Sequence, residues 1–350
     1  MGERKLINQE KLEVVNDDID QLQGAIKKQQ SNTSCFVVKP ANQWINEARL
    51  RPIPKLLYDR FWFEGELCIL FADTNVGKSI LAVQIANSIS KGIAIKGFEI
   101  ESKPKKVAYF DFELSDKQFE KRYSDNYKDH YVFNDNFLRV EINTEVDVPK
   151  QFKDYEEYIC HSFEAVIEKH QAEVLIIDNI TYLKSDNERA KDALVIMKHL
   201  KALNKKHGVS ILVLAHTPKR DATKPITKND LSGSKMLMNF CDSAFAIGES
   251  ASMPSVRYIK QIKQRNTEQV FHAGNVAVCR IENPHNFLQF EFEGFGSEEE
   301  HLKQYSTSDI SDRDNTISDL KEEGLPNTEI ASKLGISEGT VRNTLKRLDK

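Results

Sequence analysis

The sequence predicts an α/β fold: a mainly parallel sheet with helices on both faces and antiparallel strands at one edge, followed by a small all-α C-terminal domain. Four short apolar runs lie between residues 67 and 216, and helical patterns follow the first two, as in parallel sheets with covered faces. Three later strand-like runs, between residues 255 and 293, come close together with turn residues between them, which indicates antiparallel strands. Residues 311–350 form a separate segment with its own helical periodicity.

The composition is that of a globular protein and excludes several function classes. The 350 residues are 40% hydrophobic and 29% charged with a net charge of −4, so any contact with nucleic acid must come from local basic patches. The cysteines form no C-x-x-C pair, so neither a zinc site nor a redox motif is expected: Cys35, Cys68, Cys160, Cys241 and Cys279. The N-terminal stretch has no apolar core, and no apolar run reaches the ~18–20 residues of a membrane span. We therefore expect no signal peptide, no membrane contact and a cytoplasmic location.

The chain divides by composition into five segments. Residues 1–34 carry apolar residues at spacings of three and four, which predicts either a surface helix on its own domain or an arm that docks on a neighbouring subunit. Residues 35–60 contain RPIPK and are expected to be a connector. Residues 61–295 hold the predicted α/β domain, 296–310 an acid- and serine-rich linker, and 311–350 the C-terminal domain.

The predicted elements follow in order along the α/β domain. The first four strands are LCILFA (67–72), VAYFDF (107–112), VLIID (174–178) and ILVLAH (211–216). Helices follow the first two strands at SILAVQIANSIS (79–90) and SDKQFEKRY (115–123), and Ser115 is the expected N-cap of the second helix. The edge strands are SVRYIKQIK (255–263), NVAVCRI (275–281) and FLQFEFE (287–293).

The stretch FADTNVGKSI (71–80) ends like a phosphate-binding loop. Gly77, Lys78 and Ser79 match the end of G-x-x-x-x-G-K-[ST], but Ala72 stands where the pattern has its first glycine. Alanine can make the same tight exit from a strand if its φ angle is negative, and a strand before and a helix after are the setting that such a loop requires. The alternative is a chance match within a strand–turn–helix.

We therefore expect this loop to bind ATP. Lys78 would bridge the β- and γ-phosphates, and Ser79 would hold Mg²⁺. The backbone amides would point at the phosphates from the start of the helix. The predicted nucleotide-binding residues are Ala72, Asp73, Thr74, Asn75, Val76, Gly77, Lys78, Ser79 and Ile80.

Polar residues at the ends of three other strands complete the expected chemistry. Asp178 follows VLII in a Walker B pattern and is the second predicted Mg²⁺ ligand. Glu113 is the expected water-orienting acid; Asp111 is a rival, but Glu113 lies at the carboxyl end of its strand, where ligands bind in such sheets. His216 is expected either to contact the γ-phosphate or only to make a hydrogen bond at the end of its strand.

Residues 60–295 resemble the RecA-fold ATPases, in particular the DnaB-like and plasmid RepA-like hexameric helicases. The resemblance is carried by the order of five motifs: the phosphate-binding loop, FELS, LIID, LAH and KQRN. The resemblance implies a RecA-like domain that uses ATP and Mg²⁺, and a homo-oligomer, expected to be a hexamer. It also implies that Lys263 and Arg265 reach a neighbouring subunit's ATP, with an exposed basic strand as the alternative. Ala72 and His216 depart from the common pattern, although RepA-like members use histidine at the second position. KaiC-like and recombinase members share most of these motifs.

A loop beside the sensor strand is expected to contact single-stranded DNA. In RecA-fold rings the loops after the Walker B and sensor strands face the central channel, which here implies residues 181–193 and 217–235. The second loop carries basic residues suited to a phosphate backbone, unless it is only a solvated loop. These residues are Lys219, Arg220, Lys224, Lys228 and Lys235.

The segment IASKLGISEGTVRNTL (330–345) resembles the helix-turn-helix of LuxR-type and sigma-factor-like DNA-binding domains. Gly335 would make the turn and Ser337 would cap the last helix. The outward-facing residues of that helix would contact duplex DNA: Thr340, Arg342, Asn343, Lys346 and Arg347. Because the segment is near neutral in charge, docking of another protein is the alternative.

These observations leave three functions open, all of which hydrolyse ATP. The first is a ring helicase of plasmid or mobile-element replication. The second is a non-motor regulator or loader in which ATP switches assembly and the helix-turn-helix finds a DNA site. The third is a KaiC-like signalling ATPase with a docking tail.

Overall fold

The computed structural model describes residues 36–180, 191–218, 220–232, 234–304 and 307–348. The predicted N-terminal arm, residues 1–34, lies outside this range, as do residues 181–190 of the first predicted DNA loop. The chain forms two compact units that divide between Ile53 and Pro54. In the described part of the first unit, helix α2 (Ala41–Arg49) has no buried residue, and Trp44 and Ile45 are exposed.

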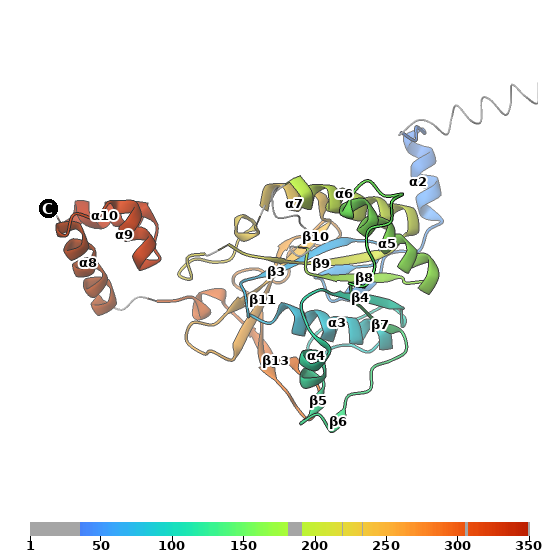
Figure 1. Cartoon of the computed structure of the whole chain (residues 1–350), viewed down its shortest axis with the longest axis horizontal. Coiled ribbons are helices and arrows are strands. Elements are labelled where there is room, and N and C mark those ends of the chain that lie inside the picture. Colours follow the sequence, from blue (N-terminus) through green and yellow to red (C-terminus); the bar gives the residue numbers. More distant parts are fainter. Residues whose placement is uncertain (1–35, 181–190, 219, 233, 305–306, 349–350) are drawn as a thin grey trace, which may run out of the picture. The chain divides into compact units, whose positions relative to one another are not determined.

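A nine-stranded sheet organises the second unit, and its architecture confirms the predicted fold class (Figure 1). The strand order is β13-β12-β11-β10-β3-β9-β8-β4-β7. Six strands are parallel: β3 (Leu67–Ala72), β4 (Val107–Asp111), β7 (Phe137–Val140), β8 (Val174–Asp178), β9 (Ser210–His216) and β10 (Ser243–Glu249). The other three extend the sheet antiparallel from β10: β11 (Val256–Lys263), β12 (Val276–Glu282) and β13 (Gln289–Gly296). The four predicted parallel strands coincide with β3, β4, β8 and β9 to within one residue.

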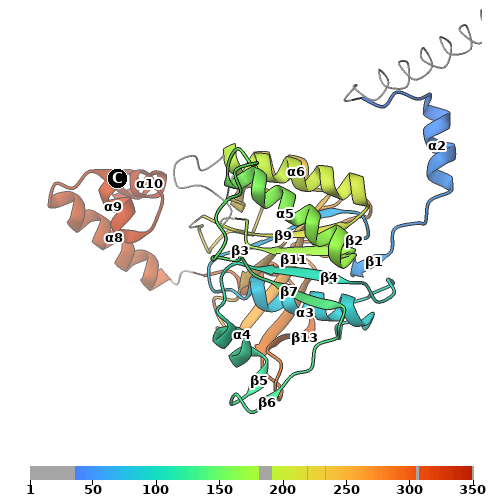
Figure 2. The same cartoon turned by 45° about the vertical axis from the view of Figure 1, so that its right-hand side comes forward.

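Helices cover both faces of the sheet because successive residues of a strand point to opposite sides. On one face, Cys68 and Leu70 of β3 pack with helix α3 (Lys78–Lys91). On the other, Leu67, Ile69 and Phe71 pack with α5 (Tyr155–His170) and α6 (Lys191–His207). Figure 2 shows α5 and α6 on the side of the sheet opposite to α3. The central strands are buried throughout, so their ends are the places where polar side chains can gather.

Short elements connect these layers. Helix α4 (Asp116–Arg122) follows β4, and Ser115 caps it as predicted. The Ser115 side chain accepts from the backbone N–H of Gln118, and the Gln118 side-chain oxygen accepts from the backbone N–H of Ser115. Strands β5 (Ser124–Asp125) and β6 (Asp129–His130) form a small hairpin. Helix η1 (Lys228–Asp230) and helix α7 (Ser234–Phe240) lie between β9 and β10.

The core is longer at both ends than the sequence suggested. Within the expected connector, β1 (Leu56–Tyr58) pairs with β2 (Trp62–Phe63), and all three residues of β1 are buried. Within the expected linker, helix η2 (Glu298–His301) buries Glu298 against Lys260 of β11, with 2.5 Å between the charged groups. The acid-rich composition of residues 296–310 predicted an exposed linker. Glu298 is instead buried, because it pairs with Lys260 inside the core.

The C-terminal helices α8 (Thr307–Glu322), α9 (Asn327–Leu334) and α10 (Glu338–Leu348) have a small core of their own. Ile317, Ile330 and Val341 are fully buried in it. Gly335 ends α9 in the left-handed region with φ 66°, and the Ser337 hydroxyl accepts from the N–H of Thr340 at 3.1 Å. Both predicted turn residues therefore act as expected. Among the described residues, no helix is long and apolar enough to cross a membrane.

Candidate active site

The carboxyl ends of four adjacent strands bring some of the predicted site residues together. The sheet order β3-β9-β8-β4 places the loop after β3 beside His216, Asp178 and Glu113, which follow or end the next three strands. A cleft of about 420 Å³ opens there, and Lys78, Glu113 and His216 line it. These residues lie far apart in the sequence, and the parallel sheet is what collects them at one edge.

The loop after β3 has the backbone that a phosphate site requires. Gly77 has φ 110° and caps α3 from the left-handed region, where a side chain is strained. A Cβ on Gly77 would lie 2.9 Å from Cδ1 of Ile281. Ala72 is not among the residues with positive φ, so alanine makes the strand exit as the sequence suggested. Of the predicted loop residues, the cleft is lined by Thr74, Asn75, Gly77, Lys78, Ser79 and Ile80, whereas Ala72, Asp73 and Val76 do not line it.

Lys78 and His216 form the centre of the cleft. The Lys78 ammonium donates to the carbonyls of Ala72 and Asp73 at 3.2 and 2.9 Å, and lies 3.1 Å from Nδ1 of His216. An ammonium can only donate, so Nδ1 accepts from Lys78, and Nε2 lies 3.7 Å from a carboxylate oxygen of Glu113. Burial lowers the pKa of Lys78, and the hydrogen bond with His216 lowers the pKa of Glu113. Glu113 is therefore ionised at neutral pH.

Asp178 is buried beside the loop with one oxygen unsatisfied. The Tyr109 hydroxyl donates to Oδ2 at 2.6 Å, whereas Oδ1 is buried without a hydrogen-bond partner among the described residues. Burial raises the pKa of Asp178 to about 6, and the hydroxyl of Ser79 partly opposes this. A carboxylate oxygen with no partner, next to a serine hydroxyl, is a donor set that suits Mg²⁺. The predicted metal ligands Ser79 and Asp178 therefore fit the ion.

The rival acid Asp111 serves a structural purpose. Its carboxylate accepts from Arg139 at 2.9 Å and from the backbone N–H groups of Glu113 and Leu114. These bonds shape the turn after β4, and Glu113 emerges from it into the cleft. Glu113 as the water-orienting acid stays a prediction, and of the two acids it is the one that lines the cleft.

Two polar residues, one in the cleft wall and one buried beside it, were missed by sequence reasoning. Arg122, at the end of α4, lines the cleft, and its Nη1 is buried without a partner in the described part of the chain. Asn179 donates from its side chain to Glu113 and lies 3.0 Å from Nε2 of His216. Asn179 directly follows the Walker B aspartate, which was a usable signal, whereas the position of Arg122 depends on how α4 packs.

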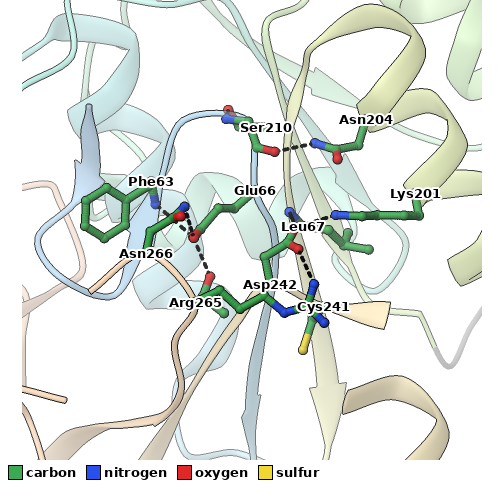
Figure 3. Close-up of polar contacts among 12 residues, drawn as sticks. Phe63, Glu66, Leu67, Lys201, Asn204, Ser210, Cys241, Asp242, Arg265 and Asn266 are labelled. Carbon is green, nitrogen blue, oxygen red and sulfur yellow. Dashed lines mark hydrogen bonds and ion pairs between the residues drawn. The ribbon is translucent and has the colours of Figure 1, made fainter. Parts of the chain in front are cut away.

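The predicted trans-acting residues lie at the opposite edge of the sheet. Lys263 ends β11 and pairs with Ala244 at the start of β10, on the side where β3 begins. The six residues of β3 separate that edge from the loop, a distance of roughly 20 Å. Figure 3 shows Arg265 beside Asp242 at this edge, and their charged groups are 3.2 Å apart. Arg265 therefore cannot contact the cleft of its own chain.

The predicted DNA-contacting loop is only partly within the described residues. Lys219 and the side chain of Lys235 lie outside them. Lys224 and Lys228 are exposed, while Arg220 donates to the carbonyl of Lys224. The buried pair Lys260–Glu298 holds the loop at Ile226. The N–H of Ile226 donates to Glu298, and its carbonyl accepts from Lys260.

The last helix of the C-terminal domain presents most of the predicted duplex-contacting residues to solvent. Arg342, Asn343, Lys346 and Arg347 are exposed and Thr340 is half-buried. Arg342 pairs with Glu338 of the same helix and Arg347 with the buried Asp314 of α8. The two arginines would have to exchange these partners for phosphates.

A family model described as "AAA domain" matches residues 36–222, which is more than half of the chain. The chain belongs to this family of P-loop ATPases. Its AAA domain includes the loop, Glu113, Asp178 and His216, but the match ends before Lys263 and Arg265. A second model, described as "Sigma-70, region 4", matches residues 320–348, which identifies the C-terminal helices as a helix-turn-helix of the DNA-binding type.

Other comparisons of this AAA ATPase add little. No curated protein matches the chain. Among solved structures, it is similar to a KaiC-like protein from the hyperthermophilic archaeon Pyrococcus horikoshii OT3, with 14% identity and a TM-score of 0.44. That match covers 65% of this chain and 90% of the other. Neither comparison places the chain within the DnaB-like or RepA-like helicases.

Proposed function

We propose that this chain hydrolyses ATP as one subunit of a homo-oligomeric, DNA-associated motor of the RepA/DnaB-like ring helicase type. The observation that carries the proposal is the division of charged residues between two edges of one sheet. Lys78, Glu113 and His216 line a cleft with Asp178 buried beside it, whereas Arg265 lies at the other edge. From that edge, Arg265 could contact ATP only in a second copy of the chain.

Each cleft residue has a role that its geometry supports. Lys78 would exchange its bond to His216 for the β- and γ-phosphate oxygens. His216 could then donate from a ring nitrogen to the γ-phosphate and transmit its presence to the loop that begins at Thr217. Glu113, ionised and held by Asn179, would accept a hydrogen bond from the attacking water and orient it. Arg122, with its unpartnered nitrogen in the cleft wall, would donate to ATP from the same chain.

Ser79 and Asp178 would hold Mg²⁺, which supplies charge neutralisation to the phosphates when bound. The raised pKa of Asp178 reflects the cost of burying its charge, and a cation beside the carboxylate offsets that cost. The proposed site in a neighbouring subunit would receive Arg265 as a stabiliser of transition-state charge. Lys263, which the same resemblance implies, would first have to release the carbonyls of Met238 and Cys241.

A second candidate is a non-motor regulator or loader, in which ATP controls assembly and the helix-turn-helix selects a duplex site. The sigma-70 region 4 match favours this reading. Cytoplasmic location is expected of both candidates.

The experiment that separates them uses the full chain with ATP and Mg²⁺. For a motor we expect ATP hydrolysis that single-stranded DNA stimulates, unwinding of forked DNA, and a closed six-fold ring with a non-hydrolysable ATP analogue. A monomer or dimer under those conditions, with specific binding of a duplex through residues 307–348, would contradict the motor and support the regulator. Absence of ATP hydrolysis in all conditions would contradict both.

A further inference from the structure

The residues on both sides of Arg265 are tied to the body of their own subunit. Lys263 donates from Nζ to the carbonyls of Met238, near the end of α7, and Cys241, the latter at 2.7 Å. On the other side, the Asn266 side chain donates to Oε1 of Glu66 at 2.7 Å. The Arg265 side chain is 53% exposed, and its one ion pair with any described residue is with Asp242. The backbone around Arg265 is therefore fixed while its guanidinium faces outward.

Glu66 is built into the sheet as an anchor. It is 3% exposed, and its Oε2 accepts from the Ser243 hydroxyl at 2.7 Å and from the N–H of Phe63 at 3.2 Å. Figure 3 shows this carboxylate between Phe63 and Asn266. Glu66 directly precedes β3, the strand that ends in the nucleotide-binding loop. It therefore links the segment around Arg265 to the strand that carries the subunit's own ATP site.

We propose that Asn266, through its bond to the buried Glu66, is a positioning residue for Arg265 in the ATP site of the neighbouring subunit. This inference rests on the proposed function of Arg265 in trans. It assigns to Asn266 and Glu66 a role that the family match, which ends at residue 222, does not reach.

A trans-acting arginine needs such an anchor for a physical reason. Stabilisation of transition-state charge requires donors that are already in place, since reorganisation during the reaction removes the benefit. The Arg265 side chain is long and loses rotamer freedom when it binds, so a mobile backbone would add a second entropic cost. The Glu66–Asn266 bond removes that backbone freedom. The Arg265 side chain, 53% exposed, can leave Asp242, whose carboxylate keeps Lys201 and the N–H of Leu67 as partners.

The test compares Asn266→Ala with Gln269→Ala and Arg265→Ala in the full-length oligomer. Asn266 is an exposed residue, so its truncation should leave the fold intact, which circular dichroism checks. Gln269 is the matched control because it is exposed and its side chain also donates to an oxygen of the core, the carbonyl of Gln261 at 2.8 Å. For each variant, kcat, KM and the Kd of a fluorescent ATP analogue are measured.

We expect Asn266→Ala to lower kcat about tenfold, because a misplaced catalytic group loses effective molarity, with the Kd for nucleotide unchanged. Gln269→Ala should keep the parental kcat. If Arg265→Ala abolishes hydrolysis while Asn266→Ala has the kcat of Gln269→Ala, the positioning role is wrong and the trans site stands. If Arg265→Ala retains the parental kcat, the trans site itself is wrong, and this inference is wrong with it.

Discussion

The two edges of the central sheet differ in how far their carboxylates have hydrogen-bond and ion-pair partners. At the carboxyl edge, Asp178 is buried with an unsatisfied oxygen and a raised pKa, and burial lowers the pKa of Lys78. At the amino edge, the carboxylate of Asp242 accepts from the N–H of Leu67 and pairs with both Lys201 and Arg265. The unsatisfied Asp178 oxygen therefore lies where we propose that a ligand binds, whereas the charge of Asp242 is satisfied within the fold.

The largest expected effect is on nucleotide affinity, and it separates two substitutions within the nucleotide-binding loop. Gly77→Ala should abolish nucleotide binding, by more than about 100-fold in Kd, because a side chain is strained at φ 110° and would meet Ile281. Ala72→Gly is the matched control: Ala72 does not have positive φ, so we expect less than about a threefold change in Kd and at most about 1 kcal/mol of stability lost. Titration with a fluorescent ATP analogue measures both. Equal Kd values for the two variants would contradict the strict requirement at Gly77.

The same chemical change should have opposite effects on stability at the two edges. Asp178→Asn removes a poorly solvated charge and should raise the free energy of unfolding at pH 8 by about 1–3 kcal/mol. Asp242→Asn removes the partner of Lys201 and Arg265 and should lower it by about 1–2 kcal/mol. Urea denaturation measures the free energy of unfolding of both variants. If both variants change it in the same direction, the two edges do not differ in how well their carboxylates are paired.

The effect of Asp178→Asn should depend on pH. The folded pKa of Asp178, about 6, lies above its ordinary value of 3.8, so the folded state binds the proton more tightly than the unfolded state. As pH rises from 3.8 to about 6, the ionisation of Asp178 therefore lowers the free energy of unfolding of the unmutated protein. Above that range the loss stays constant. The stability gain of Asp178→Asn should vanish near pH 4 and reach its maximum above pH 7. A pH-independent gain would assign it to another cause.

The smallest expected effect is on the metal requirement. Below about pH 6 a growing fraction of Asp178 is protonated, and a neutral carboxyl is a poor Mg²⁺ ligand. The Mg²⁺ concentration for half-maximal ATP hydrolysis should rise about threefold to tenfold per pH unit below that value. An unchanged requirement between pH 7.5 and 5.5 would argue against Asp178 as a ligand.

The sequence predicted the carboxyl edge far better than the amino edge. Strand ends follow directly from apolar runs, so Glu113, Asp178 and His216 could be placed together by knowing only that the strands are parallel. Arg122 could not be placed in this way, because its position depends on how α4 packs. The Glu66–Asn266 bond joins residues 200 positions apart, and Glu298, the partner of Lys260, lies inside a segment whose composition indicates a linker. Such pairings depend on register across β10, β11 and β3, which periodicity does not reveal.

Mixing two inactive variants tests most directly whether one ATP site is built from two subunits. Lys78→Ala keeps Arg265 and loses the phosphate contact, whereas Arg265→Ala keeps the loop and loses the trans-acting group. Combined, some interfaces would pair an intact loop with an intact Arg265, so we predict that hydrolysis reappears and peaks near equal amounts. The double variant mixed with Arg265→Ala is the control and should stay inactive. No regained hydrolysis at any ratio, in mixtures shown by mass measurement to co-assemble, would contradict a shared site.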